Sequence, residues 1–307
     1  MSASSAVVAP QALAGTAGTI AGHPKRAPVK VYDSPAGEAA LSAHYDEVLA
    51  ALPFPTQSRF VDTRDGRAHV LVAGAEAGRA LVVWHGKGFP GAHMMSLCGK
   101  LVEAGYRVYL PDEPCDAGSR SDPIPVDPAN HGWGRWALDV LQGLGLTSAA
   151  PGAADAAAGT PPAPVHMGMS FGGAVTLDLM AVAPHAVGAA ALIVPISVHP
   201  EFGSTKATLK MIWQLPLTWR HLRYAAMGPP VFRPGQLDGF DGPALALLAE
   251  FDIFGDGHTT ATAAKKLIPG CEAHVLPMKH APTAAQMDGC VDRVIAFLAD
   301  KRLGPKI

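Results

Sequence analysis

The segment Gly168-Met169-Ser170-Phe171-Gly172-Gly173 offers a hydroxyl group that could act as a nucleophile. It follows a short β-like run that ends at Met167 and precedes an apolar, helix-like run from Ala174 to Met180. Glycines beside a serine allow a tight strand-to-helix turn, because they lack the Cβ atoms that would clash there. Such a turn exposes the Ser170 hydroxyl and leaves the Phe171 N–H at a helix N-terminus, where it can donate to a developing oxyanion.

A serine hydroxyl needs a base that removes its proton, and a histidine near the C-terminus is expected to supply it. His280 lies in the loop Pro277-Met278-Lys279-His280-Ala281-Pro282, between a strand-like run and a helix that begins near Thr283. His258 is the competing candidate, but it lies at a helix start beside Gly257. The sequence therefore predicts His280 as the base.

A carboxylate should hold the imidazole in the required tautomer and stabilise the imidazolium. The apolar run from Ala244 to Ala249 continues into Glu250-Phe251-Asp252-Ile253-Phe254-Gly255-Asp256. Asp252 follows the strand closely and is the predicted acid, with Asp256 as the alternative. Glu250 is nearer to the strand but is expected to point away from the Asp252 side.

A second oxyanion donor should come from the loop after an earlier strand. The strand-like run Leu81-Val82-Val83-Trp84 ends in His85-Gly86-Lys87-Gly88-Phe89-Pro90-Gly91, where glycines let the backbone approach a ligand closely. We predict that the Lys87 N–H is the donor, with Gly88 as the alternative. His85 is expected to stabilise this loop by hydrogen bonding.

Alternating strand and helix patterns must position these residues. An amphipathic helix is expected within Ser34–Leu52, with Leu41, Tyr45, Val48 and Leu49 on its apolar face, and Asp65-Gly66 predicts a hairpin turn. One opening hairpin followed by strand–helix alternation predicts a mainly parallel sheet covered on both faces. Strands are predicted at Arg59–Thr63, Ala68–Ala73, Ala80–Trp84, Tyr106–Leu110, Val165–Met167, Ala189–Ile196, Ala244–Leu248 and Ala273–Leu276, and helices at Met94–Ala104, Trp133–Leu144, Ala174–Val182, Thr259–Leu267 and Ala285–Leu298.

Two stretches interrupt this alternation. Residues 149–163 are rich in Ala, Pro and Gly and predict a surface loop. Residues 197–242 contain short helix-like runs with large side chains, and we interpret them as a cap over Ser170. The alternative is a surface excursion packed on the sheet. Under the cap interpretation, four side chains line a substrate pocket: Met211, Trp213, Trp219 and Tyr224.

Composition narrows the class of protein. The chain has 307 residues, a formal charge of −2 and 49% hydrophobic residues, which suits one large α/β domain. The chain has no basic cluster with interleaved aromatics, so a nucleic-acid partner is not expected. No apolar run approaches the roughly 20 residues of a membrane span. The four cysteines lack metal-site spacing and are interpreted as reduced and structural. Residues 1–30 are expected to form a flexible tail, and a cytoplasmic location is expected because the basic residues Lys25 and Arg26 follow the apolar part.

The chain resembles the α/β-hydrolase superfamily over roughly Arg59 to Leu303. The matching residues are the strand ending at His85-Gly86, the run Leu101–Val108, Asp112 with Gly118–Asp122, the turn Gly168–Gly173, the strand ending at Asp252, and the His280 loop. The resemblance implies an eight-stranded α/β core over residues 31–196 and 243–307, with residues 197–242 as a helical cap. It also implies Ser170, Asp252 and His280 as catalytic residues and the Lys87 and Phe171 N–H groups as the oxyanion hole.

Two positions depart from the usual pattern of that superfamily. The loop usually written Asp-x-x-Gly-x-Gly-x-Ser appears here as Asp112-Glu113-Pro114-Cys115-Asp116-Ala117-Gly118-Ser119, which departs from the glycine spacing of that pattern. A lysine at position 87 is also uncommon, and its ammonium either faces solvent or favours an anionic substrate. The serine nucleophile argues against the dehalogenase and epoxide-hydrolase branches, which use an aspartate.

These observations predict a serine hydrolase that cleaves a carboxylic ester or related acyl bond of a small molecule through an acyl-enzyme intermediate. No metal or organic cofactor is expected, and a homo-oligomer is left open. The block from His85 to Gly91, with Leu101–Val108, also resembles carbon–carbon bond hydrolases of aromatic degradation. A ligand-binding or scaffold protein with a silent triad is the third alternative, because a fold does not dictate function.

Overall fold

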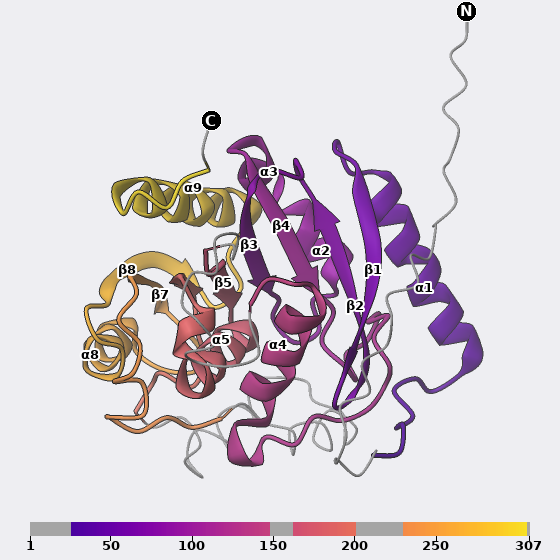
Figure 1. The fold of residues 1–307 in the computed structure, drawn as a ribbon, viewed down its shortest axis with the longest axis horizontal. Coiled ribbons are helices and arrows are strands. Elements are labelled where there is room, and N and C mark those ends of the chain that lie inside the picture. Colours follow the sequence, from indigo (N-terminus) through magenta and orange to yellow (C-terminus); the bar gives the residue numbers. More distant parts are fainter. Residues whose placement is uncertain (1–25, 148–161, 201–229, 306–307) are drawn as a thin grey trace, which may run out of the picture.

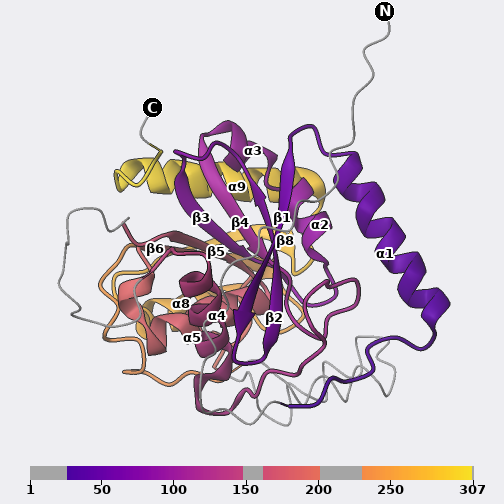
Figure 2. The ribbon, with the colours of Figure 1, turned by 45° about the vertical axis from the view of Figure 1, so that its right-hand side comes forward.

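The computed structural model describes residues 26–147, 162–200 and 230–305, and the structural statements below concern these residues. Within them, eight strands form one sheet with helices on both faces (Figures 1 and 2). The strands are β1 (Thr56–Thr63), β2 (Gly66–Ala73), β3 (Arg79–Trp84), β4 (Tyr106–Pro111), β5 (Val165–Met169), β6 (Ala189–Ile193), β7 (Ala244–Phe251) and β8 (Glu272–Lys279). The helices are α1 (Pro35–Ala50), α2 (Gly91–Ser96), α3 (Gly99–Glu103), α4 (Gly132–Gly143), α5 (Phe171–Val182), α8 (Gly257–Leu267) and α9 (Ala284–Asp300), with short 3₁₀ turns at Ala129–His131 and Pro184–Ala186.

The sheet is antiparallel at one edge and parallel from β4 onward. Its strand order is β1-β2-β4-β3-β5-β6-β7-β8. The β1–β2 pair is antiparallel, and Gly66 takes the positive φ of 93° that this hairpin requires. β2 pairs with β4 antiparallel, whereas the later neighbours run parallel. The predicted opening hairpin and mostly parallel eight-stranded sheet are confirmed.

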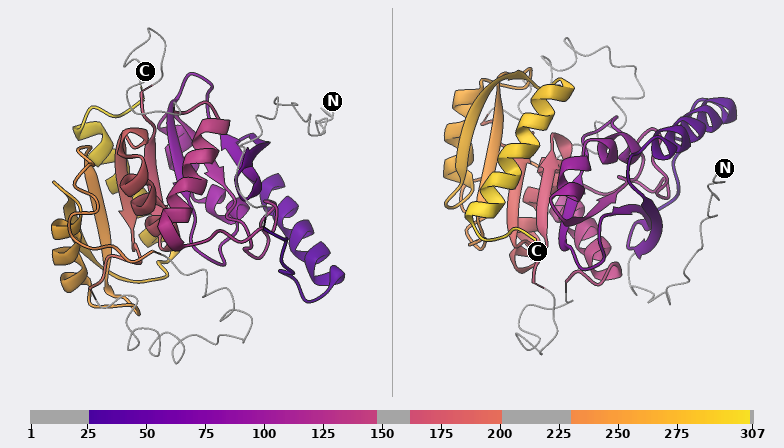
Figure 3. Two further views of the ribbon diagram at one scale, coloured as in Figure 1. Left: turned by 60° about the horizontal axis from the view of Figure 1, so that its bottom comes forward. Right: turned by 90° about the horizontal axis from the view of Figure 1, so that it is seen from above.

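The central strands are apolar at successive positions because helices cover both faces of the sheet. Val82 and Trp84 of β3 belong to a core on the side of α4, α5 and α8, whereas Leu81 and Val83 belong to a second core on the side of α1, α2, α3 and α9. Figure 3 shows α4 and α5 in front of the sheet in the left view and the yellow α9 in front of it in the right view. The molecule therefore has three layers, with the sheet in the middle.

Several predictions differ in detail from the observed elements. The predicted helix Met94–Ala104 is split into α2 and α3, because the intervening residues form tighter i→i−3 hydrogen bonds before Gly99. The strand predicted to reach Ile196 ends at Ile193, since Val194 takes a φ of 43° and Pro195 has no N–H to donate. Leu41, which is predicted to lie on the apolar face of the first helix, is 39% exposed. Tyr45 is the buried residue of α1.

Much of the predicted tail, loop and cap lies outside the described residues. Of the predicted tail, residues 26–30 are described, and there the Val29 N–H donates to the Pro123 carbonyl at 2.8 Å and Arg26 forms an ion pair with Asp127. Cys98, Cys115, Cys271 and Cys290 are buried and form no disulfide in the structure. Among the helices of residues 26–147, 162–200 and 230–305, none is both long and apolar enough to cross a lipid bilayer.

A buried carboxylate at the end of β4 joins several segments near the later site. Asp112 is fully buried and accepts hydrogen bonds from the Tyr45 hydroxyl at 3.0 Å, His69 Nδ1 at 2.9 Å, and the Gly91 and Arg120 N–H groups at 3.1 Å. Burial alone would raise the pKa of Asp112, but the hydrogen bond and charge of His69, together with the charge of His85 and the Arg120 N–H, hold this pKa below its ordinary value. The ionised carboxylate therefore fixes α1, β2 and the start of α2 against the sheet.

We predict that Asp112→Ala lowers the free energy of unfolding at pH 7 by about 3 kcal/mol or more, because it leaves buried donors without an acceptor. A depressed pKa stabilises the fold above the unfolded-state pKa, and this contribution is lost as the pH falls through the folded-state value. The difference from wild type should therefore shrink below about pH 4. Urea denaturation at several pH values measures it, with exposed Asp62→Ala as a control. A variant as stable as wild type at pH 7 would contradict this role.

Candidate functional site

The candidate site lies where two neighbouring strands end. β3 and β5 run parallel, with Trp84 paired with Gly168. The segment from His85 and the turn at Ser170 therefore both begin at the carboxyl ends of these two strands. The next strand after β3 is β4 on one side, whereas the next after β5 is β6 on the other. Chains that diverge in this way open a crevice between the two strand ends, which is where open α/β sheets bind ligands.

The turn at Ser170 holds its residue in an unusual conformation. Ser170 has φ 51° and ψ −111°, a combination that L-residues rarely adopt and that costs free energy. Its N–H donates to the Ile193 carbonyl at 3.0 Å, and its carbonyl accepts from the Gly173 and Ile196 N–H groups at 3.1 and 3.2 Å. A Cβ atom at Gly172 would collide with the Trp84 carbonyl, so glycine allows α5 to start this close to the end of β3.

The structure brings together the three predicted side chains from three separate loops. Ser170 Oγ lies 2.8 Å from His280 Nε2, and His280 Nδ1 lies 2.9 Å from Asp252 Oδ2. An ionised carboxylate can only accept, so the proton on Nδ1 faces Asp252 and Nε2 is left to accept from the Ser170 hydroxyl. This arrangement can withdraw a proton from the serine and stabilise the imidazolium that results.

The alternative acids and base occupy other places. Asp256 is the N-cap of α8, where its carboxylate accepts from the Thr259 N–H at 2.7 Å. These hydrogen bonds lower the pKa of Asp256, as expected of an N-cap carboxylate. Glu250 and His258 are exposed. Within the described residues, none of these three side chains forms a hydrogen bond or ion pair with Ser170 or His280. The observed hydrogen bonds therefore favour Asp252 as the acid and His280 as the base.

Phe254 supports both members of the Asp252–His280 pair, and the sequence analysis did not identify it. Its N–H donates to Asp252 Oδ1 at 2.9 Å, and its ring meets the His280 ring edge-on with the centroids 4.6 Å apart. The carboxylate is thereby held by the backbone while the imidazole packs against an aromatic ring. The signal in the sequence is an aromatic residue two positions after the predicted acid.

The two predicted oxyanion donors lie on adjoining segments. Phe171 is the first residue of α5, so its N–H has no acceptor within the helix. Gly86 packs beside the nucleophile, since a Cβ built there would lie 3.3 Å from Ser170 Cβ and 3.9 Å from Oγ. Lys87 follows directly, and its ammonium lies 4.7 Å from the centroid of the Phe171 ring. This proximity is compatible with a pair of N–H donors beside Ser170.

The Lys87 side chain turns into the protein. Although a third of it is exposed, its Nζ lies 2.9 Å from Oε2 of the fully buried Glu113 and 4.8 Å from the centroid of the buried Trp133 ring. Burial would lower the pKa of Lys87, but the nearby charges of Glu113 and Asp116 reverse that effect and raise this pKa above its ordinary value. Lys87 is therefore a cation paired internally, which accounts for a lysine in this loop without an anionic substrate.

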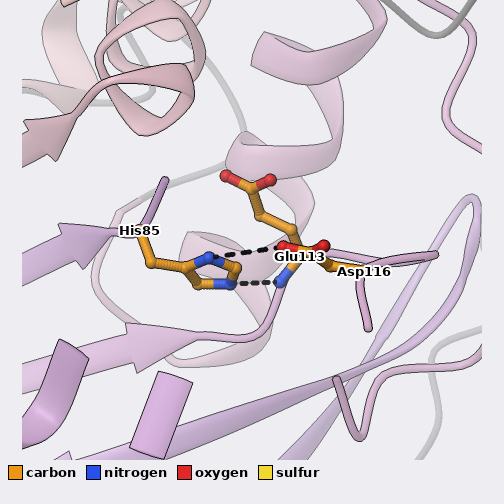
Figure 4. A group of neighbouring side chains, drawn as sticks. All are labelled: His85, Glu113 and Asp116. Carbon is orange, nitrogen blue, oxygen red and sulfur yellow. Dashed lines mark hydrogen bonds and ion pairs between the residues drawn. The ribbon is translucent and has the colours of Figure 1, made fainter. Parts of the chain in front are cut away.

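A histidine and two carboxylates gather behind the same loop. The ligand atoms of His85, Glu113 and Asp116 lie within 4.8 Å of one another, a spacing that could hold a metal ion (Figure 4). The donor set fits a metal poorly, because His85 Nε2 accepts the Glu113 N–H at 2.9 Å and Nδ1 donates to the Gly86 carbonyl at 3.0 Å. Figure 4 also shows the Glu113 carboxylate pointing away from the imidazole ring. Both imidazole nitrogens thus have backbone partners, and Nδ1 also lies 3.9 Å from Asp116 Oδ2 (Figure 4).

The predicted substrate-pocket residues lie outside the described part of the chain. These are Met211, Trp213, Trp219 and Tyr224, which belong to residues 201–229 of the predicted cap. The cap and the pocket beneath it therefore stay predictions.

Comparisons with known proteins identify similar chains at low sequence identity. No family model matches the sequence. The chain is 24% identical to the "uncharacterized carboxylesterase nap" of Bacillus subtilis (strain 168) over 266 residues, which cover 76% of this chain and 83% of that protein. It is also 24% identical to carboxylesterase YbfK of the same organism over 289 residues, covering 83% of this chain and 92% of that protein.

Solved structures show similar folds. The crystal structure of carboxylesterase CesB (YbfK) from Bacillus subtilis matches with a TM-score of 0.64 and 20% identity, covering 86% of this chain and 99% of that one. A 2-hydroxy-6-oxo-6-phenylhexa-2,4-dienoate hydrolase from Rhodococcus sp. strain RHA1 matches with a TM-score of 0.56 and 18% identity, covering 81% of this chain and 99% of that one.

The strained turn generates a prediction about stability. Ser170→Gly and Ser170→Ala both remove the hydroxyl, but only glycine adopts the positive φ without strain. We expect the glycine variant to be the more stable of the two by about 1 kcal/mol, although glycine usually costs stability. Thermal and urea unfolding of the two variants measure the difference. An alanine variant more stable than the glycine variant would show that the turn is unstrained.

Proposed function

We propose that this chain, which has the α/β-hydrolase fold, hydrolyses carboxylic ester bonds with Ser170 as the nucleophile, His280 as the base and Asp252 as the acid. The observation that carries the proposal is the unbroken series of contacts from Asp252 through His280 to Ser170, at 2.9 and 2.8 Å. Each residue has the chemistry that its position requires, and the turn presents the hydroxyl at the edge of the sheet where ligands bind.

The proposed reaction passes through an acyl-enzyme. As Ser170 Oγ attacks the ester carbonyl carbon, His280 Nε2 takes the hydroxyl proton, and the carbonyl oxygen becomes an anion that accepts from the Phe171 and Lys87 N–H groups. When the tetrahedral intermediate collapses, the bond to the alcohol oxygen breaks and the alcohol leaves with the proton from His280. His280 then deprotonates a water molecule, which attacks the acyl group and releases the carboxylic acid and free Ser170.

Similar proteins support the choice of an ester bond. The chain aligns along most of its length with two proteins named as carboxylesterases. Within this proposal the substrate is a small acyl compound bound beneath a cap of residues 197–242, and the protein acts in the cytoplasm.

A carbon–carbon bond hydrolase is the second candidate. The similarity to the 2-hydroxy-6-oxo-6-phenylhexa-2,4-dienoate hydrolase supports it, because the same machinery could attack a ketone carbonyl. Assays of the purified protein with a ring-cleavage diketone acid and with simple esters separate the two candidates. Cleavage of the diketone at a kcat/KM well above that of any ester would favour the carbon–carbon reaction.

Ser170→Ala should lower kcat for a short p-nitrophenyl ester by about 10⁵-fold or more, because the reaction loses its nucleophile. Wild-type protein should also bond covalently to a fluorophosphonate at Ser170, whereas a purely ligand-binding protein should not. Undiminished turnover by the alanine variant would refute Ser170 as the nucleophile.

The two candidate acids should respond differently to substitution. Asp252→Asn should lower kcat by about 10³–10⁴-fold, because the amide no longer stabilises the imidazolium or fixes the tautomer that accepts from Ser170. Asp256→Ala, the matched control, should cost about 1 kcal/mol of stability through loss of the α8 N-cap, while kcat stays near wild type. Steady-state kinetics and thermal unfolding of both variants measure these effects. The reverse pattern would make Asp256 the acid.

A further inference from the structure

One turn after β4 contacts the oxyanion loop of residues 85–88 at three points. The Glu113 N–H donates to His85 Nε2 at 2.9 Å, and the Glu113 carboxylate pairs with the Lys87 ammonium at 2.9 Å. Both oxygens of Asp116 accept from the Gly88 N–H, at 3.0 and 2.9 Å. Three of the four loop residues are therefore held by two acidic residues, and the Lys87 N–H lies between the held positions.

The Glu113 carboxylate depends on Lys87 for its charge balance. It is fully buried, and neither of its oxygens accepts a well-aligned hydrogen bond from the described residues, so the ammonium 2.9 Å away is its charge partner. Burial raises the pKa of Glu113, and the Lys87 charge opposes that rise. Because a buried charge without a partner is costly, the pair favours the loop conformation that keeps Lys87 folded inward.

The inward lysine also joins the two halves of the oxyanion hole. Its ammonium lies over the Phe171 ring at 4.7 Å and the Trp133 ring at 4.8 Å, in the range of a cation–π contact. The Phe171 and Trp133 rings meet edge-on with centroids 4.9 Å apart. The residue that offers one proposed donor therefore packs on the residue that offers the other.

We propose that Glu113 and Asp116 are positioning residues that set the oxyanion hole, Glu113 by holding the Lys87 ammonium against Phe171 and Asp116 by accepting the Gly88 N–H. This inference rests on the proposed function for its effect on rate. The lysine and glutamate charges cancel inside the protein, so the pair orients the loop rather than attracting an anionic substrate. The cluster of His85, Glu113 and Asp116 therefore holds the oxyanion loop in place. The cation that balances its carboxylates is the Lys87 ammonium.

The test compares Glu113→Gln, Lys87→Met and the double variant. Each single change should lower kcat for a p-nitrophenyl ester by about 10–100-fold with KM within about threefold, because a misplaced donor costs less than a deleted one. The double variant leaves no unpaired buried charge and should fold even where a single variant does not. Its kcat should be no lower than that of the worse single variant, since the two residues act as one unit. Lys87→Arg should recover part of the rate lost in Lys87→Met.

The second readout does not depend on catalysis. Amide hydrogen exchange in residues 85–91 should be faster in Glu113→Gln, in the double variant and in Asp116→Ala than in wild type, because the loop loses a contact. Asp139→Asn is the matched control. It weakens another buried ion pair, Arg64–Asp139 at 2.7 Å, and should lower the melting temperature while leaving both kcat and exchange in residues 85–91 near wild type.

The outcomes are distinct. Faster exchange in residues 85–91 together with a lower kcat supports the proposal that Glu113 and Asp116 position the oxyanion loop. Exchange in residues 85–91 unchanged in both Glu113→Gln and the double variant would overturn it, whatever the melting temperatures. Faster exchange with wild-type kcat would also overturn it, because the contacts would then hold the loop without setting the oxyanion hole. If Ser170→Ala keeps full turnover, the proposed function fails, while the exchange data still decide whether Glu113 and Asp116 hold the loop.

Discussion

The reversal of the chain at Ser170 is the constraint on which the site depends. A strand must end and a helix must begin within a single residue, and the φ of 51° at Ser170 accomplishes this at a cost in strain. The surrounding structure maintains that conformation through hydrogen bonds on both sides of Ser170, to the end of β6 and to the residues after it. The hydroxyl consequently lies at the end of β5, next to the N-terminus of α5.

The loop that follows β3 has to lie beside that turn. Two buried carboxylates, Asp112 and Asp116, hold it there. Asp112 fixes the start of α2 through the Gly91 N–H, and Asp116 accepts the Gly88 N–H. These carboxylates accept backbone N–H groups that helix and sheet leave unpaired, as buried donors require. An irregular, glycine-rich loop is thus held beside Ser170 by specific hydrogen bonds to Asp112 and Asp116.

The fold could be predicted from the sequence, and the sequence also proposes the three catalytic residues that the structure brings into contact, because both depend on local signals. Apolar runs mark the strands, and Ser170, Asp252 and His280 each follow one of these runs in a recognisable loop. The element ends were less predictable. The exposure of Leu41 and the split between α2 and α3 depend on what lies opposite each segment, and a single sequence does not encode that directly.

The supporting residues escaped the sequence analysis for the same reason. Glu113 is not singled out in the sequence analysis, where Asp116 appears only as part of a loop that departs from a glycine pattern. Their roles arise from contacts across 26 to 28 positions of sequence, with Lys87 and Gly88 respectively, which follow from the adjacency of β3 and β4. Trp133 and Phe254 gave apolar signals that any core residue could give, and only their packing against Phe171 and His280 distinguishes them.

The central claim is that Ser170 attacks a carbonyl whose oxygen is received by the N–H groups of Phe171 and Lys87. A crystal structure of the protein after reaction with a fluorophosphonate tests it most directly, because the phosphonyl group resembles the tetrahedral intermediate. The account predicts a covalent bond to Ser170 Oγ and a phosphonyl oxygen about 2.7–3.1 Å from both backbone nitrogens. A phosphonyl oxygen that points to solvent, or an adduct on another residue, would contradict it.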